Sequence, residues 1–99
     1  MSDAPGQKPR PEAQGMTIKI TDEMQHGVYA NRVIIAHSGE EFVLDFVADR
    51  PPGPQIVSRV ITAPAHALAL LEALGENIAR YQHQHGAIRR PGPSPGASA

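Results

Sequence analysis

Histidines are the residues of this 99-residue sequence whose chemistry most readily supports catalysis or metal binding. Imidazole is a common metal ligand and titrates near neutral pH. The sequence has five: His26, His37, His66, His83 and His85. Because His83 and His85 are two residues apart, they point in different directions on a helix and are poorly placed to share a metal ion. We interpret them as favourable charges at a helix C-terminus.

Carboxylate pairs, which could act as an acid and a base, occur only as Asp22-Glu23 and Glu40-Glu41. We interpret both as solvated loop residues. The absence of cysteine excludes disulfides and thiolate metal sites. We therefore expect no metal, no cofactor and no catalytic residue, and a protein that is not an enzyme. An enzyme that uses His66 or His37 is the least favoured alternative.

Three charged residues, Arg32, Asp45 and Arg59, lie within otherwise apolar runs. If Ser38-Gly39 is a two-residue hairpin loop, Arg32 lies opposite Asp45. The same register continued into the next strand places Arg59 on the other side of Asp45. Such a row could recognise an anionic group, or it could be a paired charge network inside an interface. We favour the second interpretation.

The elements that position this row are three runs rich in β-branched and aromatic residues, at about 28–37, 41–48 and 55–62. Separated by turn residues, such runs are typical of an antiparallel meander. Residues 16–20 alternate apolar and polar and predict a short fourth strand at an edge. Residues 21–27 are polar and predict a loop. A second loop contains Arg50-Pro-Pro-Gly-Pro, which cannot form a ladder.

A long helix is predicted from Pro64 to the terminator Gly86. Its apolar stripe recurs at alternating spacings of four and three, with Leu68 and Leu70 widening it: Ala67, Leu71, Leu74, Ile78 and Tyr81. Gly75 in mid-helix predicts a close approach of the helix to the sheet, the alternative being a glycine that is merely tolerated there. The predicted fold is thus α+β, a three- to four-stranded antiparallel sheet with one long C-terminal helix packed on one face.

Strand alternation gives the sheet two apolar faces. The first face, which we expect the helix to cover, carries Tyr29, Val33, Ile35, Phe42, Leu44, Phe46, Ile56 and Val60. The second face carries the charged row with Val28, Ala30, Ile34, Ala36, Val43, Val47, Val57 and Ile61. One helix cannot cover both faces, and an exposed apolar patch usually marks an interaction surface. We therefore predict a homodimer or higher oligomer whose interface or recognition residues are Arg32, Asp45, Arg59, Ile34, Val43, Val47, Val57 and Ile61.

Composition limits the domain and its partners. Residues 1–15 and 89–99 are rich in Pro, Gly and Ser and predict disordered tails around one domain at 16–88. That domain holds five Lys and Arg against eight Asp and Glu, a net charge of −3, whereas a nucleic-acid binder usually shows a basic patch. No apolar run approaches membrane-spanning length, and there is no signal-peptide apolar region. We expect a cytoplasmic protein without membrane contact.

Several short motifs resemble domain-of-unknown-function family 3467, a small prokaryotic family: Val28-Tyr-Ala-Asn31, Glu41-Phe-Val-Leu-Asp-Phe46, Ser58-Arg-Val-Ile61, Pro64-Ala-His-Ala67, Leu71-Glu-Ala-Leu-Gly-Glu-Asn-Ile78 and the ending Tyr81 to Gly86. The sequence departs from the family pattern at Ala69-Leu70, where a basic residue is expected. The resemblance implies a compact cytoplasmic domain with no known reaction. A sheet with a helical end and a second apolar face also resembles the SecB-type export chaperones at the level of fold.

These observations predict a non-enzymatic, homo-oligomeric domain that acts by binding protein or peptide. The alternative is a chaperone-like adaptor, similar to SecB, that offers the apolar face or an edge strand to extended clients. Nucleic-acid binding through Arg89, Arg90 and loop arginines is less favoured because the domain is acidic.

Overall fold

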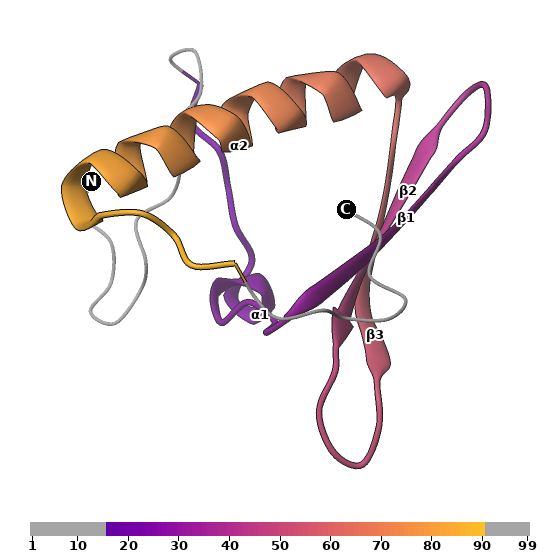
Figure 1. Cartoon of the computed structure of the whole chain (residues 1–99). Coiled ribbons are helices and arrows are strands. Elements are labelled where there is room, and N and C mark those ends of the chain that lie inside the picture. Colours follow the sequence, from indigo (N-terminus) through magenta and orange to yellow (C-terminus); the bar gives the residue numbers. More distant parts are fainter. Residues whose placement is uncertain (1–15, 91–99) are drawn as a thin grey trace.

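The computed structural model describes residues 16–90 as a three-stranded sheet and two helices (Figure 1). The elements are α1 (Asp22–Gln25), β1 (Arg32–His37), β2 (Phe42–Ala48), β3 (Gln55–Thr62) and α2 (Pro64–His85). The strands form an antiparallel meander with β2 in the centre. This confirms an α+β fold with a long C-terminal helix. Of the two predicted tails, residues 1–15 and 91–99 lie outside the described part of the chain.

The segment before β1 differs from the prediction. Residues 17–20 form no strand, and β1 begins at Arg32, not near residue 28. Where a loop was expected, α1 makes one helical turn, because the Thr21 hydroxyl accepts the Met24 amide at 3.2 Å and caps the turn. Gly27, at φ 69°, follows this turn in a conformation that glycine adopts at little cost.

The β1–β2 register differs from the prediction by two residues. Ile34 lies opposite Asp45, and Arg32 lies opposite Val47. The connection is a four-residue turn in which the Ser38 amide donates to the Glu41 carbonyl at 2.9 Å. The Ser38 hydroxyl accepts the amides of Glu40 and Glu41, at 3.2 and 3.3 Å.

A two-residue hairpin loop of the favoured kind needs left-handed backbone that serine adopts poorly. Here the Ser38 side chain stabilises the wider turn instead. A slip of two residues leaves every side chain on its predicted face, because strand periodicity is two. The cross-strand partners change, however, so the predicted row of Arg32, Asp45 and Arg59 is wrong at its first member.

The β2–β3 register agrees with the prediction up to a bulge. Leu44 lies opposite Val60, and Asp45 lies opposite Arg59. The register then shifts between Phe46 and Val47, so that Val47 lies opposite Ile56. A bulge inserts one extra residue into a strand and changes the alternation of side chains. Ile56 therefore joins Val47 on the second face, whereas uninterrupted alternation had placed it on the first.

The helix α2 has the predicted bounds. Pro64 occupies its first turn, and Ala63 precedes it in extended conformation, at φ −76° and ψ 156°. Gly86 ends the helix at φ 93°, with its amide donating to the Gln82 carbonyl at 2.9 Å. Glu76 and Arg80, four residues apart on α2, form an ion pair at 3.7 Å on the exposed surface, where such pairs contribute little.

The prediction that α2 packs on its own sheet is wrong. Extensive packing among the described elements joins β1 to β2 and β2 to β3, and no strand packs extensively with α2. No residue of α2 is buried, and Figure 1 shows the helix standing apart from the strands. The physical reason is the connection from β3, which consists of Ala63 alone. A residue before proline favours extended backbone, so Ala63 prolongs β3 and leaves no loop in which the chain could turn back onto the sheet.

Without the helix, little apolar surface is buried. The buried hydrophobic residues of the described chain are Leu44, Val47 and Ala48, all on the central strand. Large apolar residues on both sheet faces and along α2 stay exposed, among them Ile35, Val60, Ile61, Leu71 and Leu74. Three residues are too few to offset the conformational entropy of a domain this size.

The β2 core can be tested by substitution. Leu44 is 7% exposed, and Leu44→Ala should lower the free energy of unfolding by about 2–5 kcal/mol, as for buried leucines in general. Glu72 is exposed on α2, and Glu72→Ala should change it by less than about 0.5 kcal/mol. Chemical denaturation measures both values. The reverse ranking would show that β2 is not the centre of the core.

Candidate functional site

The second face is organised around an ion pair between neighbouring strands. Because Asp45 on β2 lies opposite Arg59 on β3, both side chains leave the sheet on the same side. Arg59 Nε donates to Asp45 Oδ1 at 2.7 Å, and Arg59 Nη2 donates to Asp45 Oδ2 at 2.8 Å. This bidentate geometry is the strong form of an arginine–carboxylate contact. This half of the predicted row is confirmed.

The two partners differ in exposure. Asp45 is 9% exposed at the centre of the sheet, whereas the side chain of Arg59 is 59% exposed on the edge strand β3. The hydrogen bonds from Arg59 lower the pKa of Asp45 below its ordinary value, and they outweigh the desolvation that raises it. The same bonds raise the pKa of Arg59. Both groups are therefore charged at neutral pH, and the carboxylate is satisfied where it lies.

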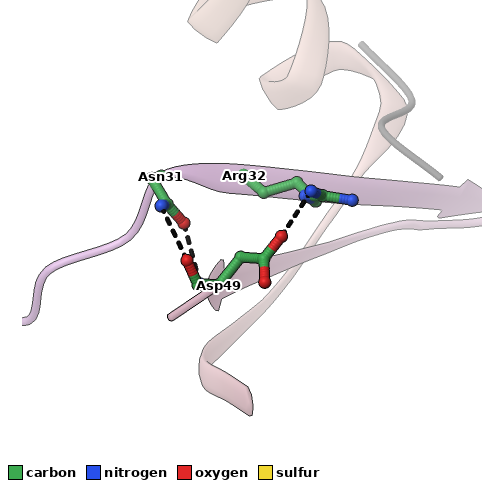
Figure 2. A network of polar contacts seen from close by, with 3 residues as sticks. All are labelled: Asn31, Arg32 and Asp49. Carbon is green, nitrogen blue, oxygen red and sulfur yellow. Dashed lines mark hydrogen bonds and ion pairs between the residues drawn. The ribbon is translucent and has the colours of Figure 1, made fainter. Parts of the chain in front are cut away.

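Arg32 belongs to a different network, at the other edge of the sheet (Figure 2). It forms an ion pair with Asp49, which directly follows β2. Asn31, directly before β1, holds the same residue: Asn31 Nδ2 donates to the Asp49 carbonyl at 3.1 Å, and the Asp49 amide donates to Asn31 Oδ1 at 2.8 Å. Asn31 and Asp49 thus clamp the start of β1 to the end of β2.

The sequence reasoning missed Asn31 and Asp49. The available signal was an Asn and an Asp at the two open ends of a hairpin, but it is visible only if the turn has four residues. A two-residue turn would place Arg32 opposite Asp45, and Asp49 would then lie in the loop after the strand. We interpret the clamp as structural, because its polar groups bond to one another.

Apolar residues surround the Asp45–Arg59 pair. Ile34 lies opposite Asp45, and Val43 lies opposite Ile61. Ile34 and Ile61 are exposed, the latter by 58%, whereas Val47 is buried. Val57 on β3 and Val43 on β2 are half-buried. The predicted interface residues are therefore gathered on one face, with Arg32 at its edge, and the arrangement suits binding more than covalent chemistry.

The histidines do not form a site. His37 stacks on Phe42, with ring centroids 5.4 Å apart, and His85 is tilted against Tyr81 at 4.8 Å. Within residues 16–90, no three of His, Cys, Asp and Glu are grouped as metal ligands would be. An open hollow of about 350 Å³ near the end of α2 is lined by Asn77, Ile78, Tyr81 and Ile88 and has no charged group. None of the helices described in residues 16–90 is long and apolar enough to span a membrane.

Comparison with known proteins gives a family and no further relative. Residues 1–90 match the model of a family described as Protein of unknown function (DUF3467). No curated protein and no solved structure matches the chain. The fold-level analogy to SecB-type chaperones stays a prediction.

The lowered pKa of Asp45 predicts a pH dependence of stability. A carboxyl whose pKa is lower in the folded state stabilises the fold above its unfolded pKa, about 3.9 for Asp. That contribution is lost as the pH falls through the lower, folded value. Asp45→Asn should therefore be less stable than wild type at pH 7, and the difference should shrink below about pH 4. Denaturation at several pH values measures this. Glu72→Gln serves as the exposed control, and a difference that is constant with pH would contradict the assignment.

A second substitution series separates charge from packing. Asp45→Ala removes the acceptor and leaves the Arg59 guanidinium beside a buried, apolar position, which is unfavourable. Replacing Asp45 with Leu and Arg59 with Met removes both charges together. The double variant should unfold at a higher denaturant concentration than Asp45→Ala alone. If it is the less stable of the two, the unpaired Arg59 guanidinium is not what destabilises Asp45→Ala.

Proposed function

We propose that this chain, which belongs to the DUF3467 family of proteins of unknown function, is a non-enzymatic domain that self-associates and acts by binding protein or peptide. The observation that supports this most is the exposed apolar surface of the second face around the Asp45–Arg59 pair. Ile34 and Ile61 are exposed on either side of that pair. A surface that is apolar and also carries an arginine, whose N–H donors have fixed directions, is typical of a protein interface.

The charged pair supports an interface over a ligand pocket. Burying an ion pair is costly unless its hydrogen bonds are satisfied. Both Asp45 oxygens accept bonds from Arg59, so a partner can cover the carboxylate without leaving it unpaired. Arginine carries five N–H donors, and the exposed guanidinium of Arg59 can offer others to a carboxylate or carbonyl of the partner. Arginine at such positions often contributes much of the binding energy.

The edge strands support a second candidate, a SecB-like adaptor for extended clients. In the described sheet, β1 and β3 each pair on one side only, with β2. Extended peptides can add to such an edge through backbone hydrogen bonds, while apolar positions accept alternate side chains. This function requires the edges and the second face to stay accessible in the assembled protein. Self-association through the second face would cover that face.

Other partners are less well supported. The five basic and eight acidic residues of 16–88 disfavour a nucleic-acid surface. Location in the cytoplasm stays an expectation from the sequence.

Sedimentation at micromolar concentration tests self-association. Wild type should sediment as a dimer or larger, and Ile61→Asp should shift it towards smaller species, because a carboxylate would have to be desolvated in the interface. Val28→Asp is the matched control, since Val28 is similarly exposed but precedes β1, and it should leave the sedimentation coefficient unchanged.

A stable wild-type monomer would overturn the self-associating part of the proposal. An oligomer that Ile61→Asp leaves intact would instead exclude the second face as the interface. In that case, binding of an unfolded model polypeptide, measured for wild type and for Ile61→Asp, would distinguish the adaptor function.

A further inference from the structure

We infer that α2 of each copy packs on the first sheet face of a second copy, so that two chains complete each other's core. This inference rests on the self-association proposed above and adds a second contact between copies, which uses the first face and α2 where the proposed interface uses the second face. It concerns two surfaces that residues 16–90 leave largely exposed: the apolar stripe of α2, and the first face of the sheet.

The connection between these surfaces is the first argument. β3 ends at Thr62 and α2 begins at Pro64, so only Ala63 lies between them. Ala63 is extended, as a residue before proline must be. A helix of 22 residues, about 33 Å long, is thereby directed away from its own sheet. Short connections of this kind favour exchange of an element between identical chains over packing within one chain.

The chemistry of the two surfaces is the second argument. The stripe of α2 presents apolar side chains only: Ala67, Leu71, Leu74, Ile78 and Tyr81. The first face holds no Asp, Glu, Lys or Arg; it carries Val33, Ile35, Phe42, Leu44, Phe46 and Val60, with His37, Ser58 and Thr62 as its polar members. The second face carries the Asp45–Arg59 pair, and an apolar stripe over it would leave the remaining N–H donors of Arg59 without polar partners. The stripe therefore matches the first face better.

Gly75 gives the third argument. Glycine in a helix interior costs about 1 kcal/mol relative to alanine, and a close approach of another element would explain it. Within one chain, nothing lies within 4 Å of where a Gly75 Cβ would stand. Gly75 lies at the edge of the apolar stripe, between Leu71 and Ala79 in the i±4 row. A close approach at Gly75 by a surface of a second copy would therefore meet no obstacle from residues 16–90 of its own chain.

A second copy is the occupant that the chain itself favours. In the described part of each copy, one helix stripe and one first face are largely exposed. Two copies can therefore exchange helices symmetrically, so that both surfaces of both copies are covered. Such a closed, two-fold arrangement is the commonest form of homo-oligomer. A different protein would have to supply both a sheet-like surface for α2 and a helix-like element for the sheet.

Cross-linking between single-cysteine variants tests the exchange, because the natural sequence has no cysteine. Leu74→Cys places a thiol on the stripe, and Val60→Cys places one on the first face, at a residue that is 44% exposed. The two full-length variants, one with an affinity tag to change its mass, are unfolded together, refolded and treated with a short bismaleimide. We expect a covalent heterodimer with one tagged and one untagged chain.

Two matched pairs serve as controls. Ala69→Cys lies on the opposite side of α2 from the stripe, and Ile61→Cys lies on the second face of the sheet. The pairs Ala69→Cys with Val60→Cys and Leu74→Cys with Ile61→Cys should each cross-link at least about tenfold less than the test pair. Gly75→Ala should in addition shift the sedimenting species towards monomer.

Other outcomes would overturn the inference in identifiable ways. Preferred linkage to Ile61→Cys would place α2 on the second face, and linkage only between two Leu74→Cys chains would indicate a helix–helix seam. Linkage within one chain that carries both Leu74→Cys and Val60→Cys, and none between chains, would show that α2 folds back on its own sheet. If wild type sediments as an oligomer but the test pair does not link, the exchange fails while the proposed self-association stands. A wild-type monomer would overturn both the helix exchange and the proposed self-association.

Discussion

The single residue between β3 and α2 constrains the rest of this structure. A pre-proline residue favours extended backbone, so Ala63 continues the backbone of β3 up to the first residue of α2. In most α+β domains a helix returns over the sheet and buries one of its faces. Here it does not, and the apolar surfaces of helix and sheet stay apart within one chain. The scarcity of buried residues follows from this one connection.

The sheet itself is held by more specific contacts. Each of its two ladders has an ion pair: Arg32 with Asp49 beside the β1–β2 hairpin, and Arg59 with Asp45 across β2 and β3. The Asn31 amide group adds reciprocal hydrogen bonds to the backbone of Asp49. These contacts define the register where few buried side chains can do so. They explain how three strands keep a defined alignment although their apolar side chains are largely exposed.

The same contacts bear on function. Charged groups that are fully bonded to one another are poor candidates for chemistry, because a reaction needs a group that is free to exchange a proton or bind a substrate. Asp45 is ionised and held by Arg59, and the histidines of the described chain lie apart or stack on aromatic rings. The binding function proposed above uses these groups in a different way: apolar area contributes affinity, and the Arg59 guanidinium contributes specificity.

The sequence by itself determined β2, β3 and α2 and their order, but not α1, which forms where the sequence predicts a loop. Proline, glycine and the periodicities of two and 3.6 located β2, β3 and α2, since these signals are local. The pairing of Asp45 with Arg59 also followed from alternation along neighbouring strands. Alternation could not determine the register between β1 and β2. The Ser38 hydroxyl stabilises a four-residue turn, so that Arg32 pairs with Asp49 and not with Asp45. A bulge places Ile56 on the second face. The position of α2 was likewise decided by tertiary structure, because an apolar stripe shows that a helix face will be buried but not which surface, or which chain, will cover it.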